Sequence, residues 1–489
     1  MYGVLSLKST AMSRKLQSFL YSFGVVFLLF FVMGLGACAS HGETNEADDD
    51  DTLHVDDDSI SDDDETDDDE SDDDTSVNNP LFIADTARIE TTSAGGSYVF
   101  GRFSYAPNVS VAYDQNGKYL WQVEYEDLLW QDIAMTVDEN DSLIVGFEEC
   151  LLYDDLNVCQ SLGLEIVTFD VNGDLDSSSV LADTVFGGDF EVTNDTFLTL
   201  TTGKDGAPLG AASVVLWEQD SATSALIELA ATEGNLDWTM STDDATCLHQ
   251  DAVFRTSGNL VVLNLIEDDP RITVEISEFD QMLAQVWSTS WEFPDSTDTD
   301  YKWRSSLALT VVGAVVAAGS LYKQVSGALK SFFLYVGSDG QILWSDSVDG
   351  QSITGVAAGP NEELYAIGGV GELGDQVPMV VKYDSDGNLV WQSVADGTRN
   401  QPTGVFQSMT IDNSGNVFAA SDVIASLDPD GELRWAREFP EGRAYDIAVN
   451  SEGEVFAVGG AEESSRMITV KYDNNGTELW VAEFDANNP

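Results

Sequence analysis

The sequence predicts an all-β fold, a β-propeller built from four-stranded blades. Its clearest repeating unit covers residues 380–392, where β-branched and aromatic residues flank an Asp-Ser-Asp-Gly-Asn turn. The tryptophan of this unit, Trp391, returns as Trp435 and Trp480 at successive intervals of 44 and 45 residues. A second hairpin-like piece, clearest at residues 411–420, lies between these units. Two hairpins in a repeat of roughly 40 to 50 residues supply the four strands of a propeller blade.

Eight such units fit between residues 80 and 489, and the last four are the most regular. They cover residues 87–125, 132–178, 187–231, 247–290, 305–347, 353–395, 404–438 and 445–484. The third unit is the least regular, and its second hairpin is assigned to residues 214–229. Seven blades is the alternative, with one early unit as an insertion. Residues 80–84 are candidates for a strand that closes the ring, although residues 445–484 already supply four strands.

The repeated tryptophan, glycine and acidic turn residues are explained by packing without a ligand. A tryptophan on the outer strand of a blade, such as Trp344, is expected to cover the sheet of the next blade. Gly387 suits the positive φ that a tight turn requires. Four tryptophans fall outside the repeat positions and are either local packing residues or loop-borne aromatics of a binding face: Trp130, Trp238, Trp291 and Trp303.

Residues 1–37 have the pattern of an export signal. Arg14 and Lys15 precede an almost uninterrupted apolar run over residues 19–34. The positive start, the apolar run and the small residues after it indicate a signal peptide rather than a spanning helix. Met12 is an alternative start, because it gives a more usual positively charged beginning.

The segment Leu35-Gly36-Ala37-Cys38 follows the apolar run directly. It resembles the lipobox of bacterial lipoproteins, whose cysteine receives a diacylglyceryl group and becomes the mature N-terminus. The resemblance implies that Cys38 is lipidated, with palmitate as an expected acyl chain, and that the protein is exported and lipid-anchored in a bacterial envelope. With Ala39 after the cysteine, the sorting rule of that family implies the outer membrane. An ordinary secretory signal or an uncleaved anchor is the alternative.

Residues 38–79 follow as a tether, and the part from residue 41 onward is strongly acidic. It contains 20 Asp and Glu and no Lys or Arg. Such a composition cannot bury apolar surface and repels itself, so a disordered linker is expected. A solvated spacer is favoured over a calcium-binding segment.

The predicted propeller, residues 80–489, is also acidic, with 67 Asp and Glu against 17 Lys and Arg. An excess of about 50 negative charges opposes binding to nucleic acid and to anionic lipid surfaces. It suits a cationic partner, a contact bridged by a divalent metal ion, or a saline habitat, and the habitat is the simplest explanation.

The pattern Tyr-Asp-x-Asp-Gly-x-Leu-x-Trp at residues 383–391 resembles the repeats of pyrroloquinoline-quinone-type eight-bladed propellers. It is also similar to the propeller lipoprotein of the outer-membrane β-barrel assembly machinery. The resemblance covers most of residues 80–489 and implies the fold rather than an activity. Quinoprotein dehydrogenases of that family use adjacent cysteines and an Asp base beside a calcium ion. No adjacent cysteines occur in this sequence, so no catalytic residue is carried over.

The remaining cysteines suggest one disulfide. Cys150 and Cys159 flank eight residues between two predicted hairpins, and in an exported protein a bond between them would contribute about 2 to 3 kcal/mol. Cys247 is then left over. Cys247, His249 and Asp251 alternate as metal ligands do, but a fourth ligand is missing, so zinc is not predicted. His249 is also the single histidine after residue 79, which argues against imidazole acid–base chemistry.

Two acidic loops are candidates for calcium, because carboxylate and amide oxygens are the ligands this ion prefers. The candidate ligands are Asp170, Asn172, Asp174 and Asp176 in one loop, and Asp295, Asp298 and Asp300 in the other. Neither loop matches the full twelve-residue calcium pattern, and a solvated turn is the alternative. No other cofactor is predicted.

Two functions from different classes remain. The favoured one is a membrane-anchored, non-enzymatic binding or scaffold module on the surface or in the periplasm, with an envelope protein or glycan as partner and a monomeric propeller. The alternative is a quinone-dependent, dehydrogenase-like or hydrolytic enzyme with its site in the propeller channel. The missing dicysteine and the scarcity of histidines count against the enzyme.

Overall fold

The computed structural model describes residues 5–6, 87–102, 108–125, 133–153, 159–182, 191–203, 207–218, 221–232, 235–243, 247–268, 271–293, 301–323, 329–372, 376–394, 405–460 and 466–486. These ranges form β-strands joined by turns. No helix among them is long and apolar enough to cross a membrane. The lipidation candidate Cys38 and the acidic tether lie outside the described residues, as does nearly all of the predicted signal peptide.

The first four blades are antiparallel sheets in which each strand pairs with the next one along the chain. Blade 1 contains β2 (Ala87–Thr91), β3 (Ser97–Gly101), β4 (Asn108–Tyr113) and β5 (Tyr119–Tyr125). Blade 2 contains β6 (Ala134–Val137), β7 (Leu143–Tyr153), β8 (Cys159–Phe169) and β9 (Leu175–Ala182). Blade 3 contains β10 (Glu191–Thr202), β11 (Pro208–Glu218), β12 (Ser221–Thr232) and β13 (Asn235–Asp243). Blade 4 contains β14 (Cys247–Phe254), β15 (Leu260–Asp268), β16 (Arg271–Phe279) and β17 (Gln285–Glu292).

The last four blades repeat this order. Blade 5 contains β18 (Tyr301–Leu309), β19 (Val315–Lys323), β20 (Leu329–Val336) and β21 (Ile342–Asp349). Blade 6 contains β22 (Gln351–Ala358), β23 (Leu364–Val370), β24 (Val377–Tyr383) and β25 (Leu389–Val394). Blade 7 contains β26 (Ser408–Ile411), β27 (Val417–Ala420), β28 (Val423–Leu427) and β29 (Leu433–Glu438). Blade 8 contains β30 (Arg443–Val449), β31 (Val455–Gly460), β32 (Arg466–Tyr472) and β33 (Glu478–Asp485). A two-residue strand, β1 (Leu5–Ser6), lies parallel to β5.

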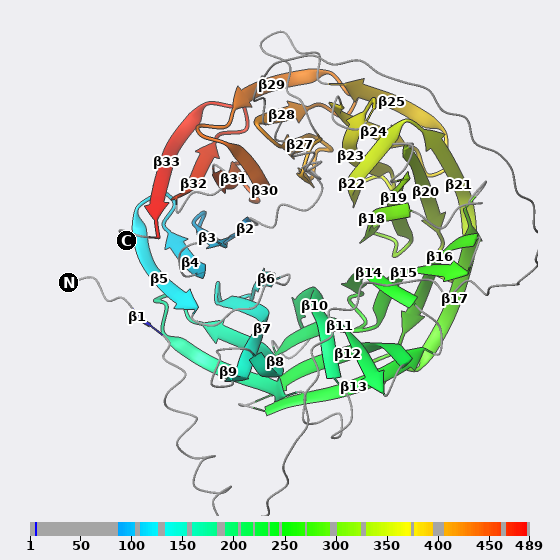
Figure 1. The fold of residues 1–489 in the computed structure, drawn as a ribbon. Helices are drawn as coiled ribbons and strands as arrows, with labels where there is room; N and C mark the ends of the chain where they lie inside the picture. Colours follow the sequence, from blue (N-terminus) through cyan, green and yellow to red (C-terminus); the bar gives the residue numbers. More distant parts are fainter. Residues whose placement is uncertain are drawn as a thin grey trace, which may run out of the picture. The chain divides into compact units, whose positions relative to one another are not determined.

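The eight blades form a closed ring, seen along its axis in Figure 1. The first strand of each blade is innermost and contacts the first strand of the next blade, and β30 of blade 8 contacts β2 of blade 1. The fourth strands form the circumference (Figure 1). The prediction of an all-β propeller with eight four-stranded blades is therefore confirmed.

The ring closes by packing between its first and last blades. Blade 8 is built entirely from the C-terminal strands β30 to β33. Its Phe456 and Val458 share one buried apolar cluster with Ile89, Val99 and Val111 of blade 1. Among the described residues no strand of one blade enters the sheet of the other, and the predicted closing strand at residues 80–84 lies outside them.

The third blade differs from its prediction. The expected second hairpin, residues 214–229, falls on the end of β11 and most of β12. The actual second hairpin joins β12 to β13, so the blade extends to Asp243 rather than to residue 231. Its strands of 9 to 12 residues are longer than those of blade 7, which have 4 to 6. The position of the turns was therefore misjudged.

The hydrophobic core lies between successive blades. Phe333 and Tyr335 of blade 5, for example, share a buried cluster with Leu364, Val381 and Tyr383 of blade 6. Strand alternation gives every sheet two apolar faces, because a blade is covered by a neighbour on each side. The ring is therefore held together by blade-to-blade burial, of order 25 cal/mol for each Å² of apolar surface removed from water.

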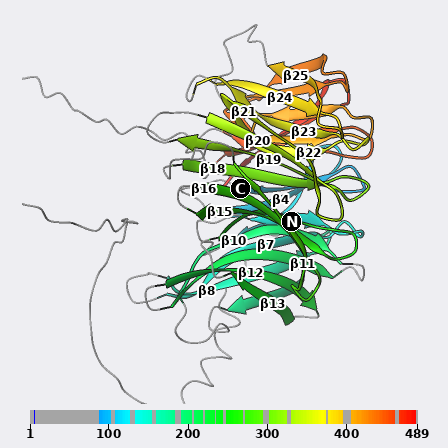
Figure 2. The ribbon, with the colours of Figure 1, turned by 90° about the vertical axis from the view of Figure 1, so that its right-hand side faces the viewer.

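One face of the ring is formed by short turns. In a four-stranded antiparallel blade, the turn from the first to the second strand lies at the same end as the turn from the third to the fourth. We call the face that carries these two sets of turns the tight-turn face. In Figure 2 the ring is seen edge-on, with the blade strands running from one face to the other.

Candidate functional site

A repeated contact joins the tryptophan of one blade to a turn of the next. The indole N–H of Trp391 in blade 6 donates to the Pro429 carbonyl oxygen of blade 7 at 2.9 Å. The equivalent bonds run from Trp121 to Val171 (3.0 Å), Trp344 to Ser385 (3.0 Å), Trp435 to Asn474 (3.0 Å) and Trp480 to Gln115 (3.2 Å). The Trp287 indole instead donates to the Glu278 carboxylate at 2.7 Å. The repeated tryptophans are thus packing residues, as expected from the sequence.

Two backbone features place each tryptophan. In β25 the register shifts between the pairs Tyr383–Leu389 and Lys382–Trp391, so Val390 forms a bulge just before the tryptophan. In the next blade Gly431, with φ of 84°, covers the indole so closely that a Cβ there would lie 2.6 Å from the Trp391 ring. The Gly in the Asp-x-x-Gly turn is therefore required both by the turn and by the tryptophan beneath it.

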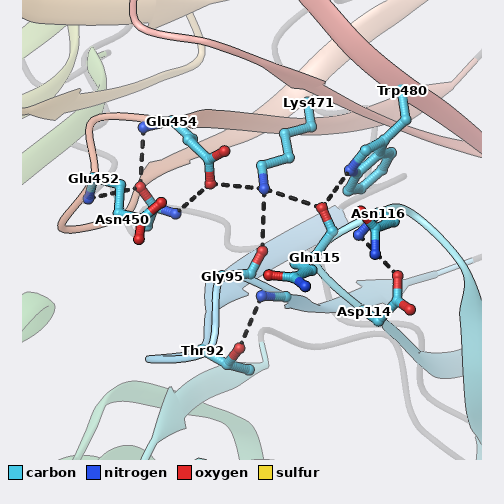
Figure 3. Close-up of polar contacts among 11 residues, drawn as sticks. Thr92, Gly95, Asp114, Gln115, Asn116, Asn450, Glu452, Glu454, Lys471 and Trp480 are labelled. Carbon is cyan, nitrogen blue, oxygen red and sulfur yellow. Dashed lines mark hydrogen bonds and ion pairs between the residues drawn. The ribbon is translucent and has the colours of Figure 1, made fainter.

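Buried lysines reinforce the same junctions. Lys471 of β32 is 2% exposed, pairs with Glu454 at 2.7 Å, and donates to the carbonyl oxygens of Gly95 and Gln115 at 3.2 Å each. The Gln115 oxygen also accepts the Trp480 indole, so two donors from blade 8 meet one turn of blade 1 (Figure 3). Lysine and tryptophan together close the ring where no covalent connection joins the blades.

The same arrangement occurs between blades 6 and 7. Lys382 pairs with Glu363 at 3.1 Å and donates to the Pro429 carbonyl oxygen at 3.2 Å. Its ammonium group lies 5.0 Å from the centre of the Tyr365 ring. Its alkyl stem is buried while its charge is fully partnered, which is the condition for burying a lysine at tolerable cost.

The first calcium candidate is a turn of this repeated kind. Asp170 follows β8, and its Oδ1 accepts the backbone amides of Asn172 at 2.8 Å and Asp174 at 2.9 Å. Its Oδ2 accepts the Asn172 side chain at 3.2 Å. These hydrogen bonds, led by the amide of Asp174, lower the pKa of Asp170. In blade 6, Asp384 Oδ1 likewise accepts the backbone amides of Asp386 and Asn388, and its Oδ2 accepts the Asn388 side chain.

The remaining predicted ligands lie in β9 or outside the described residues. Asp176 lies in β9, and Asp295, Asp298 and Asp300 lie outside the described residues. Within the described ranges, no group of three or more His, Cys, Asp or Glu side chains is arranged to hold a metal ion. Calcium binding at either loop stays a prediction.

The two disulfide candidates lie on neighbouring strands. Cys150 in β7 is opposite Leu162 of β8, and Cys159 in β8 is opposite Tyr153 of β7. They therefore belong to one ladder without being cross-strand partners. The bond itself stays a prediction.

The non-repeat tryptophans are carried by strands where they are described. Trp238 lies in β13, Trp291 in β17 and Trp303 in β18, while Trp130 falls outside the described residues. Trp291 packs edge-on against Phe293, with ring centres 5.3 Å apart. Its role is local packing, the simpler of the two interpretations.

Two aspartates near the ring axis hold innermost strands together. Asp446 of β30 accepts the amide of Ile89 in blade 1 at 3.0 Å and the Ser408 hydroxyl of blade 7 at 2.6 Å. Asp251 of β14 accepts the amide of Leu307 in blade 5 at 2.8 Å. Both follow a register shift in their strand, so they occupy equivalent places in blades 8 and 4. Burial raises the pKa of Asp251 to about 6, against the opposing effect of the Leu307 amide.

Glu90 is the most perturbed carboxyl described near the axis. Ile89 packs into the cluster shared with blade 8, so its neighbours Arg88 and Glu90 face the other side of β2. Burial raises the pKa of Glu90 to about 8, and the negative charge of Asp446 adds to this effect, although the Glu90 side chain keeps partial access to solvent. The charge of Arg88 reaches Asp251 and lowers the pKa of that carboxyl.

The axis therefore carries one carboxyl, that of Glu90, whose pKa is raised to about 8 by burial and by the charge of Asp446. A carboxyl with a raised pKa can donate a hydrogen bond or a proton to a ligand. Neither Glu90 nor Asp446 was predicted from the sequence, because they lie in different blades and neither belongs to a motif. The raised pKa depends on burial that only the closed ring creates.

Comparisons with known proteins find the fold and little else. No family model matches the chain, and no curated protein matches it. The Dos1 propeller is similar at 11% identity and a TM-score of 0.46, covering 76% of this chain and 89% of that one. The polysaccharide lyase Uly1 is similar at 11% identity and a TM-score of 0.44, covering 71% of this chain and 88% of that one. The WD40 β-propeller domain of Doa1 is similar at 11% identity and a TM-score of 0.36, covering 79% of this chain and 93% of that one.

Likenesses this distant carry no argument about activity. The assignment of the fold rests on the strand pairing of the blades themselves.

Proposed function

We propose that the chain is a lipid-anchored envelope protein whose propeller is a non-enzymatic binding or scaffold module for a protein or glycan. A propeller fold suggests a binding or scaffold module. The observation that carries the proposal is the use of the repeated side chains. Tryptophan, lysine and turn aspartate are engaged between blades or within turns, so these repeated side chains hold the ring together and leave its faces to contact a partner.

The anchor is supported by the sequence alone. Cys38 follows a positive start and an apolar run, as in the lipobox of bacterial lipoproteins. A linker that contains 20 acidic residues, within residues 41–79, then separates Cys38 from the ring. This arrangement would hold the propeller away from the membrane surface on a solvated tether. The repeats support a relation to the pyrroloquinoline-quinone-type propellers of bacteria.

The anchor is tested by growing the host with a labelled palmitate analogue. The wild-type protein is expected to incorporate the label and to fractionate with the outer membrane. The Cys38→Ser variant is expected to lose the label and to accumulate as unprocessed precursor. Equal labelling of the two proteins would contradict the assignment of Cys38.

The binding function is tested by cross-linking in intact envelopes of the host, followed by purification of the full-length protein. A defined protein or glycan cross-linked at constant stoichiometry is the expected result. Turnover of a substrate by the purified protein, or the absence of any specific cross-link, would contradict the proposal.

A second candidate is an enzyme that works at the ring axis. It is favoured by one observation, the placement of Glu90, with a pKa of about 8, in the field of Asp446. A buried carboxyl with a raised pKa is the kind of group that serves as a general acid in hydrolytic chemistry. This function requires that Glu90→Gln and Asp446→Asn each abolish turnover on a substrate panel, and a wild-type protein without turnover would exclude hydrolysis of the panel's substrates.

A further inference from the structure

One turn of the tight-turn face carries two exposed aliphatic side chains at its tip. Val311 is 82% exposed and Val312 is 70% exposed, in the turn between β18 and β19 of blade 5. Equivalent described turns have polar or small tips: Ser93-Ala94, Glu139-Asn140, Thr256-Ser257, Pro360-Asn361, Asn413-Ser414 and Ser451-Glu452. The two valines gain nothing from burial within the ring, and β-branched residues are poor turn formers. We call Val311 and Val312 together the valine tip.

The valine tip is held in place from both sides. In blade 4 the Arg255 guanidinium donates to the carbonyl oxygen of Gly313, the residue after the tip. In blade 6 the Glu362 Oε1 accepts the backbone amide of Val312 at 3.2 Å. Glu362 adopts a φ of 67°, an uncommon conformation for a residue other than glycine. A tip fixed by two neighbouring blades loses little further conformational freedom when it is buried by a partner.

The surroundings of the valine tip are negative. Glu362 pairs through one oxygen with the tip itself, and its Oε2 is buried without a hydrogen-bond partner among the described residues. Asp339 is exposed in the outer turn of blade 5, next to Ser338, whose Cβ lies 4.0 Å from where a Cβ on Gly313 would be. The neighbouring cation Arg255 is already engaged, because it pairs with Glu278 at 2.9 Å.

These charges determine which kind of partner fits. An acidic surface, including a second copy of this chain with its excess of negative charge, would be repelled. A neutral surface would leave the negative charge around the valine tip without a partner. A partner that places lysine or arginine around an apolar contact would pair with Asp339, would be attracted by the charge of Glu362, and would bury the valines.

We propose that the valine tip, flanked by Glu362 and Asp339, is the docking site for a cationic protein segment that carries aliphatic or aromatic side chains. The inference rests on the proposed binding function and names the site and the partner class for it. The exposed valines supply apolar contact, the exposed Asp339 supplies an ion-pair partner, and the charge of Glu362 adds to the attraction.

The test uses the full-length protein and three fluorescent twelve-residue peptides that alternate Lys with Leu, Lys with Ser, and Glu with Leu. Binding is measured by fluorescence anisotropy for wild type, V311N/V312S and N413A/S414A. The first variant copies the polar Asn413-Ser414 tip of blade 7, and the second changes that equivalent tip as the control. Because the substituted side chains are exposed, the thermal midpoint of each variant should stay within about 2 °C of wild type.

The wild type is expected to bind the Lys/Leu peptide more tightly than the Lys/Ser peptide and not to bind the Glu/Leu peptide. V311N/V312S is expected to weaken Lys/Leu binding at least about tenfold, equivalent to about 1.4 kcal/mol, and N413A/S414A to change it less than about twofold. Equal binding of the Lys/Leu and Lys/Ser peptides would reveal charge attraction alone and overturn the proposal. Equal effects of the two variants, or no binding by wild type, would also overturn it.

Failure of this site and failure of the binding function are separable. If the peptide measurements contradict docking at the valine tip while envelope cross-linking still recovers a defined partner, the module binds through another surface. If cross-linking recovers no partner, the binding function itself fails.

Discussion

Removing the ammonium group of Lys471 is expected to loosen the ring at its closure. Lys471 is 2% exposed and bonds to Glu454 of its own blade and to two carbonyl oxygens of blade 1. Removing one partner of a buried ion pair costs about 3 to 5 kcal/mol. Glu454 keeps 23% side-chain exposure and a hydrogen bond from Asn450 at 2.8 Å, so its charge is not left fully buried and unpaired. We therefore expect Lys471→Met to lower the free energy of unfolding by about 2 to 3 kcal/mol.

The matched control is Lys382→Met, which removes the equivalent lysine between blades 6 and 7. Both variants are expected to lower the free energy of unfolding in urea by similar amounts. They should differ in local opening, since chain connectivity joins blades 6 and 7, whereas blades 8 and 1 meet only through side-chain and packing contacts.

Hydrogen exchange followed by mass spectrometry measures that difference. Lys471→Met should lose protection first in β2 to β5 and β30 to β33, while Lys382→Met should show a smaller local loss in blades 6 and 7. A change in unfolding free energy below about 0.5 kcal/mol for Lys471→Met, or an equal loss of protection in all blades, would refute the reasoning.

Three further predictions concern a turn, the axis and the cysteines. Gly387→Ala should lower the free energy of unfolding in urea by about 2 kcal/mol more than Gly350→Ala. Both glycines have positive φ, but a Cβ at Gly387 would lie 2.8 Å from the tryptophan of the preceding blade, whereas a Cβ at Gly350 would have nothing within 4 Å. Equal losses for the two variants would contradict the role of that contact. Folding raises the pKa of Glu90 from 4.5 to about 8. The unfolding free energy of wild type should therefore fall relative to that of Glu90→Gln as pH rises from about 4.5 to 8. A difference between the two proteins that stays constant across that range would contradict the raised pKa. Alkylation of the denatured, unreduced protein should leave Cys150 and Cys159 unmodified in peptide mass spectra, and their free modification would exclude the disulfide.

The regular part of the fold was readable because its signals are local. The turn at Gly387 and Trp391 lie within a few residues of each other, and each is required by a contact that recurs in most blades. Repetition then gave the number of blades. Blade 3 lacked this signal, and its long strands allowed the second hairpin to be placed too early.

Features that depend on the closed ring were not readable. The hydrogen bond from Lys471 to the Gln115 carbonyl oxygen spans 356 positions, and the one from the Ile89 amide to Asp446 spans 357. No periodicity links residues at such separations, so the closure and the raised pKa of Glu90 required the three-dimensional arrangement. Val311 and Val312 were visible in the sequence as apolar residues, but their exposure was not, because the same residues are typical of strands.

Native mass spectrometry of the full-length protein, purified from its host's envelope in mild detergent, tests the central claim most directly. We expect the mass of a single lipidated chain, alone or with a cationic protein partner that dissociates at high salt. Added mass that matches a quinone held within the propeller would contradict it and make the ring axis an enzyme site.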